Sequence, residues 1–252
     1  MDADHRPAVS VSAQNLRKSY RLGEHQSLGL TVRRLVRRAD SLPRFEALAG
    51  VDFECLRGEA LGIVGTNGSG KSTLLQILAG TTLPTDGEMR VRGHVIPLLS
   101  VGQGFHPELT GTENVTLFAS SLRIPRDIIR ERMDDVTAFA DLGQHMDTPV
   151  KRFSSGMISR LSFAIAMQFP ADIYVLDEVL AVVDGEFQAR CLEAIKGLRD
   201  AGSTVFFVSH NLDQVAEVCD RVMWLERGTV RRIGAAGAVL DAYQHALVPE
   251  PH

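Results

Sequence analysis

The alternation of apolar and polar residues predicts the first elements of the chain. Residues 9–13 and 51–55 alternate with a period of two, which is typical of half-buried strands. The short apolar run at 60–64 predicts a buried strand, and the glycine-rich segment 65–70 predicts a loop after it. Leucines at helical spacing in 71–79 then predict a helix, and residues 84–87 predict a turn before another strand. Strand, glycine loop and helix are therefore expected in this order.

The rest of the chain changes between helical and strand-like patterns. Between about 110 and 170 the pattern is helical, and Pro170 ends the last of these helices. Strands and helices alternate beyond it, which predicts an α/β fold with a mostly parallel sheet and helices on both faces. The predicted helices are 113–122, 127–140, 155–169, 186–198, 212–218 and 235–246, and the predicted strands are 173–176, 204–208 and 222–225.

The composition is that of an ordinary globular protein. Of 252 residues, 44% are apolar, which excludes disordered and fibrous classes. The net charge of −4 argues against a strongly basic nucleic-acid binder. The three cysteines are too few and too scattered for a disulfide framework, so we expect buried, reduced thiols. The N-terminus lacks the apolar segment of a secretory signal, and no apolar run reaches the roughly 20 residues that span a membrane.

A phosphate-loop pattern, G-x-x-x-x-G-K-[ST], fits residues 65–72 at every fixed position. Glycines let backbone N–H groups turn toward phosphate oxygens, and the following helix points its positive end at the same anion. We expect Lys71 to reach the β- and γ-phosphates and the Ser72 hydroxyl to bind Mg²⁺. A glycine-rich turn that binds nothing is the alternative, which the flanking strand and helix disfavour. The predicted nucleotide contacts are Gly65, Thr66, Asn67, Gly68, Ser69, Gly70, Lys71 and Ser72.

Two carboxylates, Asp177 and Glu178, follow the predicted strand 173–176 at the edge where open α/β sheets bind ligands. We expect Asp177 to act on Mg²⁺ through bound water, and Glu178 to be the base or water-positioning residue for attack on the γ-phosphate. His210 ends another strand, expected beside the first, from which it could reach the γ-phosphate. The alternatives are two solvated charges and a structural histidine, and the neighbouring phosphate loop favours the catalytic interpretation.

Taken together, these residues resemble an ATP-binding cassette (ABC) ATPase over nearly the whole chain. The phosphate loop of that family then extends to Thr73, the acidic strand is 173–177 with Glu178, and His210 matches the switch histidine. The resemblance implies a P-loop NTPase fold with an antiparallel β-region beside the mostly parallel sheet. It also implies ATP and Mg²⁺ as cofactors.

Further site residues follow from the resemblance alone. The family's signature sequence matches residues 153–157, so Ser154, Ser155 and Gly156 would contact nucleotide. Asp184 matches the family's D-loop aspartate, and Tyr20 matches the aromatic residue that stacks on adenine. Gln103 is the glutamine nearest to the family's Mg²⁺-binding position, although its spacing to Leu109 is shorter than usual.

Two departures from the family pattern narrow the resemblance. The signature ends Ser-Gly-Met rather than Gly-Gly-Gln, and the segment around Gln103 has unusual spacing. Both features resemble ATPase subunits that export O-antigen, capsule or teichoic acid. The resemblance implies a homodimer that holds two ATP molecules between the phosphate loop of one subunit and the signature of the other. It implies two copies of a transmembrane permease, a lipid-linked glycan substrate, and a peripheral location on the cytoplasmic face of the bacterial inner membrane.

A basic amphipathic segment is predicted at 28–42. Apolar residues recur there at helical spacing, and Arg33, Arg34, Arg37 and Arg38 occupy the other side. One interpretation is contact with anionic headgroups or with the pyrophosphate of a lipid-linked glycan, because arginine binds phosphate bidentately. The other is a solvated helix packed on its own domain. The sequence leaves both interpretations open.

The expected organisation is a single ABC ATPase domain over 1–252. Its core would comprise 8–109 and 171–234, with a helical subdomain at 110–170 and a C-terminal helix and tail at 235–252. We expect no C-terminal carbohydrate-binding domain of the kind that some O-antigen subunits carry. The preferred function is an ATP-hydrolysing transport subunit with no nucleic-acid partner. The alternatives are another ABC transporter class, a soluble ABC ATPase acting on ribosomes or DNA, and a non-hydrolysing sensor.

Overall fold

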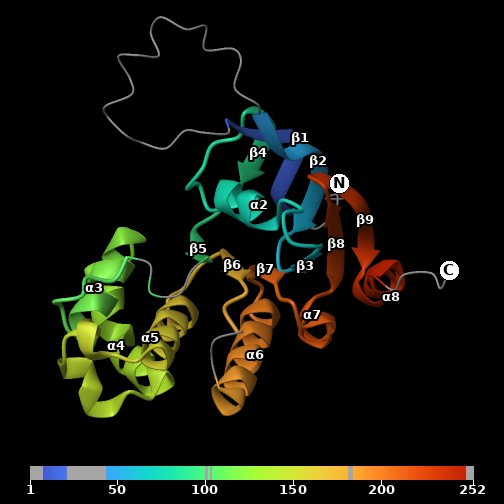
Figure 1. The fold of residues 1–252 in the computed structure, drawn as a ribbon. Helices are drawn as coiled ribbons and strands as arrows, with labels where there is room; N and C mark the ends of the chain where they lie inside the picture. Colours follow the sequence, from blue (N-terminus) through green and yellow to red (C-terminus); the bar gives the residue numbers. More distant parts are fainter. Residues whose placement is uncertain (1–7, 22–43, 100–101, 103, 181–183, 248–252) are drawn as a thin grey trace, which may run out of the picture.

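The computed structural model of the chain describes residues 8–21, 44–99, 102, 104–180 and 184–247. Its centre is a six-stranded sheet in the order β5-β6-β7-β3-β8-β9 (Figure 1). Neighbouring strands run parallel except β9, which is antiparallel to β8. The strands are β3 (Ala60–Val64), β5 (Val95–Leu98), β6 (Ile173–Asp177), β7 (Thr204–Val208), β8 (Arg221–Glu226) and β9 (Thr229–Ala235).

A second, three-stranded antiparallel sheet covers one face of the first, together with helix α2 (Lys71–Leu78). Its strands are β1 (Val9–Arg21), β2 (Arg44–Leu56) and β4 (Asp86–Val91). Side chains alternate across the central strands, so Leu61 and Ile63 of β3 join the cluster between the sheets. Phe53 of β2 and Phe206 of β7 meet edge to face there, with ring centroids 6.1 Å apart.

The other face of the central sheet packs against helices. Ala60, Val64, Val205 and Phe207 point to this side and share one apolar cluster with the helices. The helices concerned are α6 (Gly185–Asp200), α7 (Leu212–Val218) and α8 (Ala236–Leu247). The remaining helices, α3 (Gly111–Ser121), α4 (Arg126–Ala140) and α5 (Ser155–Gln168), form a group at one end of the molecule (Figure 1), with two short 3₁₀ turns, η2 (Gly143–Asp147) and η3 (Val150–Arg152).

Most predicted elements are confirmed by the structure, and the fold class is confirmed as well. The strands at 60–64 and 204–208 and the helix at 212–218 have the predicted bounds, and the other predicted helices differ by a few residues at their ends. The cysteines, predicted to be buried, are buried and unpaired.

The predicted strand lengths near the N-terminus are wrong, and two strands were not predicted. β1 and β2 each extend over 13 residues, because irregular pairing interrupts the alternation that would have marked their full length. β5 contains Pro97 and β9 contains two consecutive arginines, which weaken a strand pattern in the sequence. Both lie at edges of the six-stranded sheet, where proline and charged residues are tolerated.

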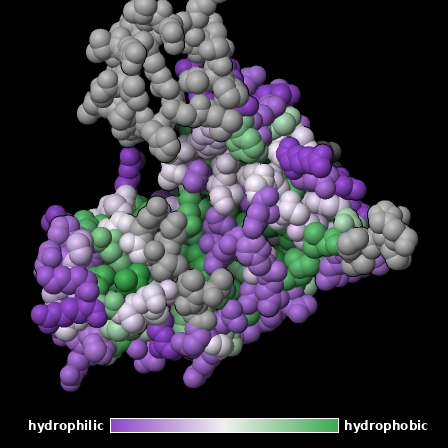
Figure 2. All heavy atoms as spheres, in the orientation of Figure 1, coloured by the Kyte–Doolittle hydropathy of each residue, from purple (hydrophilic) through white to green (hydrophobic). Residues whose placement is uncertain are grey.

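Some predictions concern residues that the structure does not describe. The basic segment 28–42, with Arg33, Arg34, Arg37 and Arg38, lies outside the described residues, as does Gln103. None of the helices in the described part of the chain combines the length and the apolar composition needed to cross a membrane. In Figure 2, apolar side chains gather over the α3–α5 group, and polar side chains surround them. Leu117 of α3 is 42% exposed in this group.

Candidate functional site

The phosphate-loop segment joins buried strand β3 to helix α2 in a path that leaves no space for side chains at two glycines. A Cβ at Gly65 would lie 2.2 Å from the carbonyl oxygen of Leu225, and one at Gly70 would lie 2.5 Å from that of Ala47. Gly70 also has a φ of 108°, which favours glycine. No side chain caps the first turn of α2, so its N–H groups are available to an anion.

Lys71 is buried at the start of α2, and its side chain turns back over the loop. Its Nζ donates hydrogen bonds to the carbonyl oxygens of Gly65, at 2.8 Å, and Thr66, at 3.2 Å. Burial lowers the pKa of the Lys71 ammonium, and the charges of Glu178 and Asp177 partly offset this. The lysine charge is therefore held next to two carboxylates, where a bound polyphosphate would stabilise it.

Asp177 ends β6 with one carboxylate oxygen facing no donor. Its Oδ1 is buried without a hydrogen-bond partner among the described residues. Burial raises the pKa of the Asp177 carboxyl, while a hydrogen bond from Ser72 lowers it. An orphaned buried carboxylate oxygen beside a serine hydroxyl fits a hard cation such as Mg²⁺, which commonly takes one or two protein oxygens and completes its ligands with substrate phosphates and water.

Glu178 and His210 meet at the edge next to Asp177. Strands β6 and β7 pair in parallel with Asp177 opposite Val208, which confirms the prediction that these strands are neighbours. His210 Nε2 lies 2.7 Å from Glu178 Oε1. Glu178 has a φ of 53°, and its N–H donates to Val208 O at 2.9 Å. The backbone thus holds Glu178 in a conformation uncommon for a non-glycine residue, as often occurs at functional sites.

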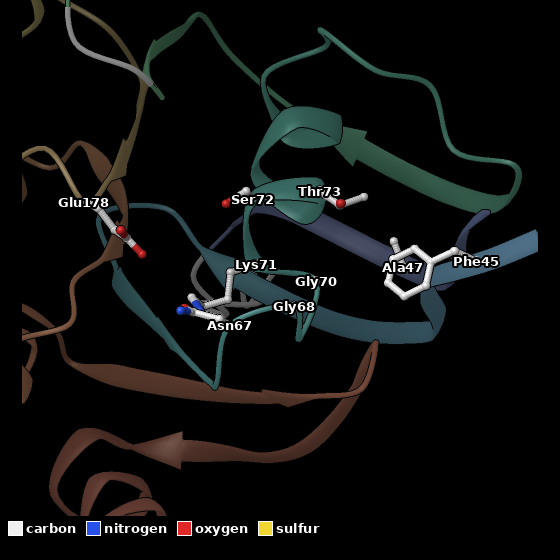
Figure 3. A pocket seen from close by; sticks show the side chains of 9 residues that line it. All are labelled: Phe45, Ala47, Asn67, Gly68, Gly70, Lys71, Ser72, Thr73 and Glu178. Atoms are coloured by element: carbon white, nitrogen blue, oxygen red, sulfur yellow. The ribbon is translucent and has the colours of Figure 1, made fainter. Parts of the chain in front are cut away.

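Lys71, Ser72 and Glu178 border one cavity of about 170 Å³ (Figure 3). In the view of Figure 3, Glu178 lies on one side, Lys71 in the middle, and Phe45 and Ala47 on the other side, beyond Thr73. The lining residues are Phe45, Ala47, Asn67, Gly68, Gly70, Lys71, Ser72, Thr73 and Glu178. The cavity is therefore charged at one end and apolar at the other.

Two lining residues, Phe45 and Ala47 of β2, were missed in the sequence. The resemblance implies that Tyr20 stacks on the base, but Tyr20 lies near the end of β1 and is not among the lining residues. Tyr20 pairs with Phe45 across the two strands, so the pairing of β1 with β2 was the signal that could have identified Phe45. This signal required knowing the register between strands separated by more than 20 residues.

The signature residues lie away from this cavity. Ser154 caps α5, and its Oγ accepts a hydrogen bond from Met157 N at 3.2 Å. Ser155 beside it is exposed, and in Figure 1 the α5 helix stands apart from α2. Asp184 caps α6 through Phe187 N at 3.0 Å and pairs with Arg160 of α5 at 2.7 Å. Within one subunit, these residues therefore do not join the phosphate loop.

Comparison with known proteins identifies the family. The sequence profile described as ABC transporter matches residues 48–181, which include the phosphate loop, the signature and the acidic strand end. The chain belongs to the ABC transporter family. As a member of this family, it is an ATP hydrolase coupled to transport.

Relatives of this ABC ATPase share most of its length. It is 39% identical over 247 residues to the O-antigen export system ATP-binding protein RfbB of Klebsiella pneumoniae, covering 96% of this chain and 99% of that protein. It is 40% identical over 238 residues to the teichoic acids export ATP-binding protein TagH of Levilactobacillus brevis, covering 94% of this chain and 65% of that protein.

Solved structures support the fold of the ABC ATPase. A dimeric post-hydrolysis state of the ATP-binding cassette MJ0796 bound to ADP and Pi superposes with a TM-score of 0.74. It is 23% identical, and the match covers 90% of this chain and 98% of that one. At 23% identity the match supports the fold alone, which has two sheets and a helical group. It confirms the predicted fold class.

The raised pKa of Asp177 predicts a pH-dependent stability. The folded chain binds a proton at this carboxyl more readily than the unfolded chain, so this group lowers the free energy of unfolding as pH rises from about 4 through its folded pKa. Asp177→Asn should remove this decrease in the free energy of unfolding. In a buffer that contains a chelator and no nucleotide, the variant should melt at a higher temperature than the native chain, and the difference should grow with pH.

The control for this measurement is Asp241→Asn, which removes an exposed carboxylate of α8. Its melting temperature should follow that of the native chain at every pH. If the difference in melting temperature between Asp177→Asn and the native chain shrinks with rising pH, the buried Asp177 carboxylate does not destabilise the fold, and the interpretation is wrong.

Proposed function

We propose that the chain is the ATP-hydrolysing subunit of an ABC transporter that exports a lipid-linked polysaccharide. The observation that carries the proposal is the match to RfbB, an O-antigen export system protein, over 99% of its length at 39% identity. The similarity to a teichoic acid export protein supports the same substrate class. The groups that hydrolysis needs are present in the phosphate loop, at the acidic end of β6 and in His210.

The geometry suggests how the residues divide the chemistry. The first-turn N–H groups of α2 and the Lys71 ammonium bind the β- and γ-phosphates. Ser72 and Asp177 would hold Mg²⁺, which neutralises charge on the transferred phosphoryl group when bound. Glu178 orients or deprotonates the attacking water, and His210 at 2.7 Å positions that carboxylate and can reach the γ-phosphate.

A homodimer would complete the nucleotide sites. Ser154 stands at the N-terminus of α5, a helix of 14 residues whose first N–H groups favour an anion. The N-terminus of α5 does not line the cavity of its own subunit. It would therefore bind the nucleotide that is held by the phosphate loop of a second copy. Dimeric ABC cassettes of the same fold support this arrangement. Ser155, Gly156 and Asp184 would act at the same interface.

The remaining partners follow from the proposed transport. Two copies of a transmembrane permease would carry the glycan, with the ATPase subunits bound at the cytoplasmic face of the inner membrane. The segment with Arg33, Arg34, Arg37 and Arg38 would contact lipid phosphate. Gln103 would approach Mg²⁺ from the segment between β5 and α3.

Substitution of Glu178 separates ATP binding from hydrolysis. Glu178→Gln keeps the size of the side chain but removes its charge, so MgATP should still bind while phosphate release falls by about a hundredfold or more. Because the nucleotide then persists, the variant should form a dimer with ATP, detected by light scattering. Glu193→Gln, on α6 and outside the cavity, should behave as the native chain. Undiminished turnover in Glu178→Gln would exclude the proposed role.

The same variant tests the transported substrate. Replacing the native copy by Glu178→Gln in the source bacterium should reduce surface polysaccharide and raise the cellular pool of lipid-linked glycan. Affinity capture from those membranes should recover a polytopic permease. Normal surface polysaccharide, or recovery of ribosomal proteins instead of a permease, would contradict the export function.

Mixed dimers test whether the sites are shared between subunits. Ser154→Arg blocks the end of α5, and Lys71→Ala removes the phosphate-binding cation, so each variant alone should have no intact site in its dimer. A mixed dimer regains one site with neither substitution and should recover part of the hydrolysis. Isolated Ser154→Arg subunits should bind ATP within about twofold of the native chain, because a bond lost only in the dimer does not affect the monomer.

Two results of this experiment would contradict shared sites. One is loss of ATP binding by monomeric Ser154→Arg, which would place Ser154 in the site of its own subunit. The other is a mixture that forms dimers, shown by differently tagged subunits, yet remains as inactive as either variant. A mixture of Lys71→Ala with Glu193→Gln subunits serves as the control for exchange of subunits.

A further inference from the structure

Helices α5 and α6 lie side by side, and aromatic rings join them (Figure 1). Phe163 of α5 and Phe187 of α6 are buried and meet edge to face, with ring centroids 6.3 Å apart. Phe139 of α4 contacts both rings, since it stacks on Phe163 at 6.2 Å and meets Phe187 edge to face at 5.6 Å. Buried rings packed in this way resist sliding of one helix past the other. We therefore expect α5 and α6 to move together.

Arg160 of α5 continues this junction to the N-terminus of α6. Its guanidinium lies over the Phe187 ring, 5.0 Å from the centroid, and donates a hydrogen bond to Asp184 Oδ2 at 2.7 Å. Another of its N–H groups donates to Asp141 Oδ2, at the end of α4, at 3.3 Å. The Arg160 side chain is 25% exposed, and the ring and the two carboxylates hold its charge in place. Arg160 thus joins the helix that begins after Ser154 to the first turn of α6.

Helix α6 is attached in turn to the residues that follow Glu178. Val179 and Leu180 are 3% and 2% exposed, and they belong to the same apolar cluster as Phe187. Gln188 of α6 donates a hydrogen bond from Nε2 to the carbonyl oxygen of Leu180 at 2.9 Å. Glu178 directly precedes these anchored residues, and its φ of 53° leaves its backbone few alternatives. The position of α6 therefore limits where the Glu178 carboxylate can point.

The two ends of this connected unit would serve different nucleotide sites. Glu178 lines the cavity of its own subunit, whereas Ser154 at the start of α5 does not. We propose that Arg160 is a positioning residue that couples the two sites of the homodimer, because it links the α5 end at the partner's nucleotide to Glu178 at the subunit's own nucleotide. Nucleotide bound by the partner shifts α5, and Arg160 carries this shift through α6 to Glu178. The inference rests on the proposed function and adds communication between its two sites.

Dimers with one or two intact sites measure this coupling. A dimer of a native and a Lys71→Ala subunit keeps one site, and the α5 end of its native subunit faces a phosphate loop without nucleotide. At saturating MgATP, phosphate release per intact site should be at least about fivefold faster in native two-site dimers than in these one-site dimers. With Arg160→Gln in both subunits, the two rates should agree within about twofold, both near the native one-site rate. Isolated Arg160→Gln subunits should bind MgATP within about twofold of the native chain, because Arg160 lies outside the cavity.

Three further variants control for charge and for folding. Arg160→Lys keeps a cation that can approach Asp184 and should recover part of the difference between two-site and one-site dimers. Arg132→Gln removes an α4 arginine that pairs on the surface with Asp135 at 3.1 Å, and it should behave as the native chain. Asp184→Asn can still accept the hydrogen bond from Phe187 N but loses the charge that Arg160 binds. It should remove the difference as Arg160→Gln does, and it supplies the result if Arg160→Gln does not fold.

Several results would overturn the role of Arg160. One is a native difference between two-site and one-site dimers that persists in Arg160→Gln. Another is an equal loss of rate in both kinds of Arg160→Gln dimer, which would leave Arg160 a structural role only. Equal rates per site in the native dimers would mean that the sites are not coupled. Failure of the native chain to dimerise with ATP or to hydrolyse it would instead overturn the proposed function.

Discussion

The tight passage of the chain from β3 into α2 is the constraint on which the rest of the site depends. Strand β3 is buried on both faces, and the loop after it is confined by main-chain carbonyl oxygens of Leu225 on one side and Ala47 on the other. These two oxygens belong to different sheets. The packing of the two sheets therefore fixes where the first N–H groups of α2 point. Glycine is needed at 65 and 70, where these carbonyl oxygens approach the loop.

The parallel pairing of β6 with β7 brings Asp177, Glu178 and His210 to the same edge of the sheet. Burial raises the pKa of Asp177 and lowers that of Lys71, so the folded site disfavours both charges. A cation at Asp177 would give its Oδ1 the partner that it lacks, and phosphates at Lys71 would add negative charge beside the ammonium. Mg²⁺ and polyphosphate bound together would therefore balance the charges of the site, and binding of either ligand would favour binding of the other.

Local patterns predicted those parts of the fold and site that depend on adjacent residues. The strand at 60–64 and the phosphate loop were predictable because their signals lie within a dozen residues. Edge strands β5 and β9 were not predictable, because Pro97 and the arginines of β9 are tolerated only through their position in the sheet. Phe45 was missed for a similar reason, since its place at the cavity depends on the register of β1 with β2.

The most direct test of the central claim compares two glycines at opposite ends of α2. Gly70 and Gly80 have φ values of 108° and 70°, but a Cβ meets the Ala47 carbonyl oxygen at 2.5 Å only at Gly70 and meets nothing within 4 Å at Gly80. Calorimetric titration with MgATP should show native affinity for Gly80→Ala and a loss of at least about tenfold for Gly70→Ala. Native affinity in Gly70→Ala would contradict the claim that this passage builds the nucleotide site.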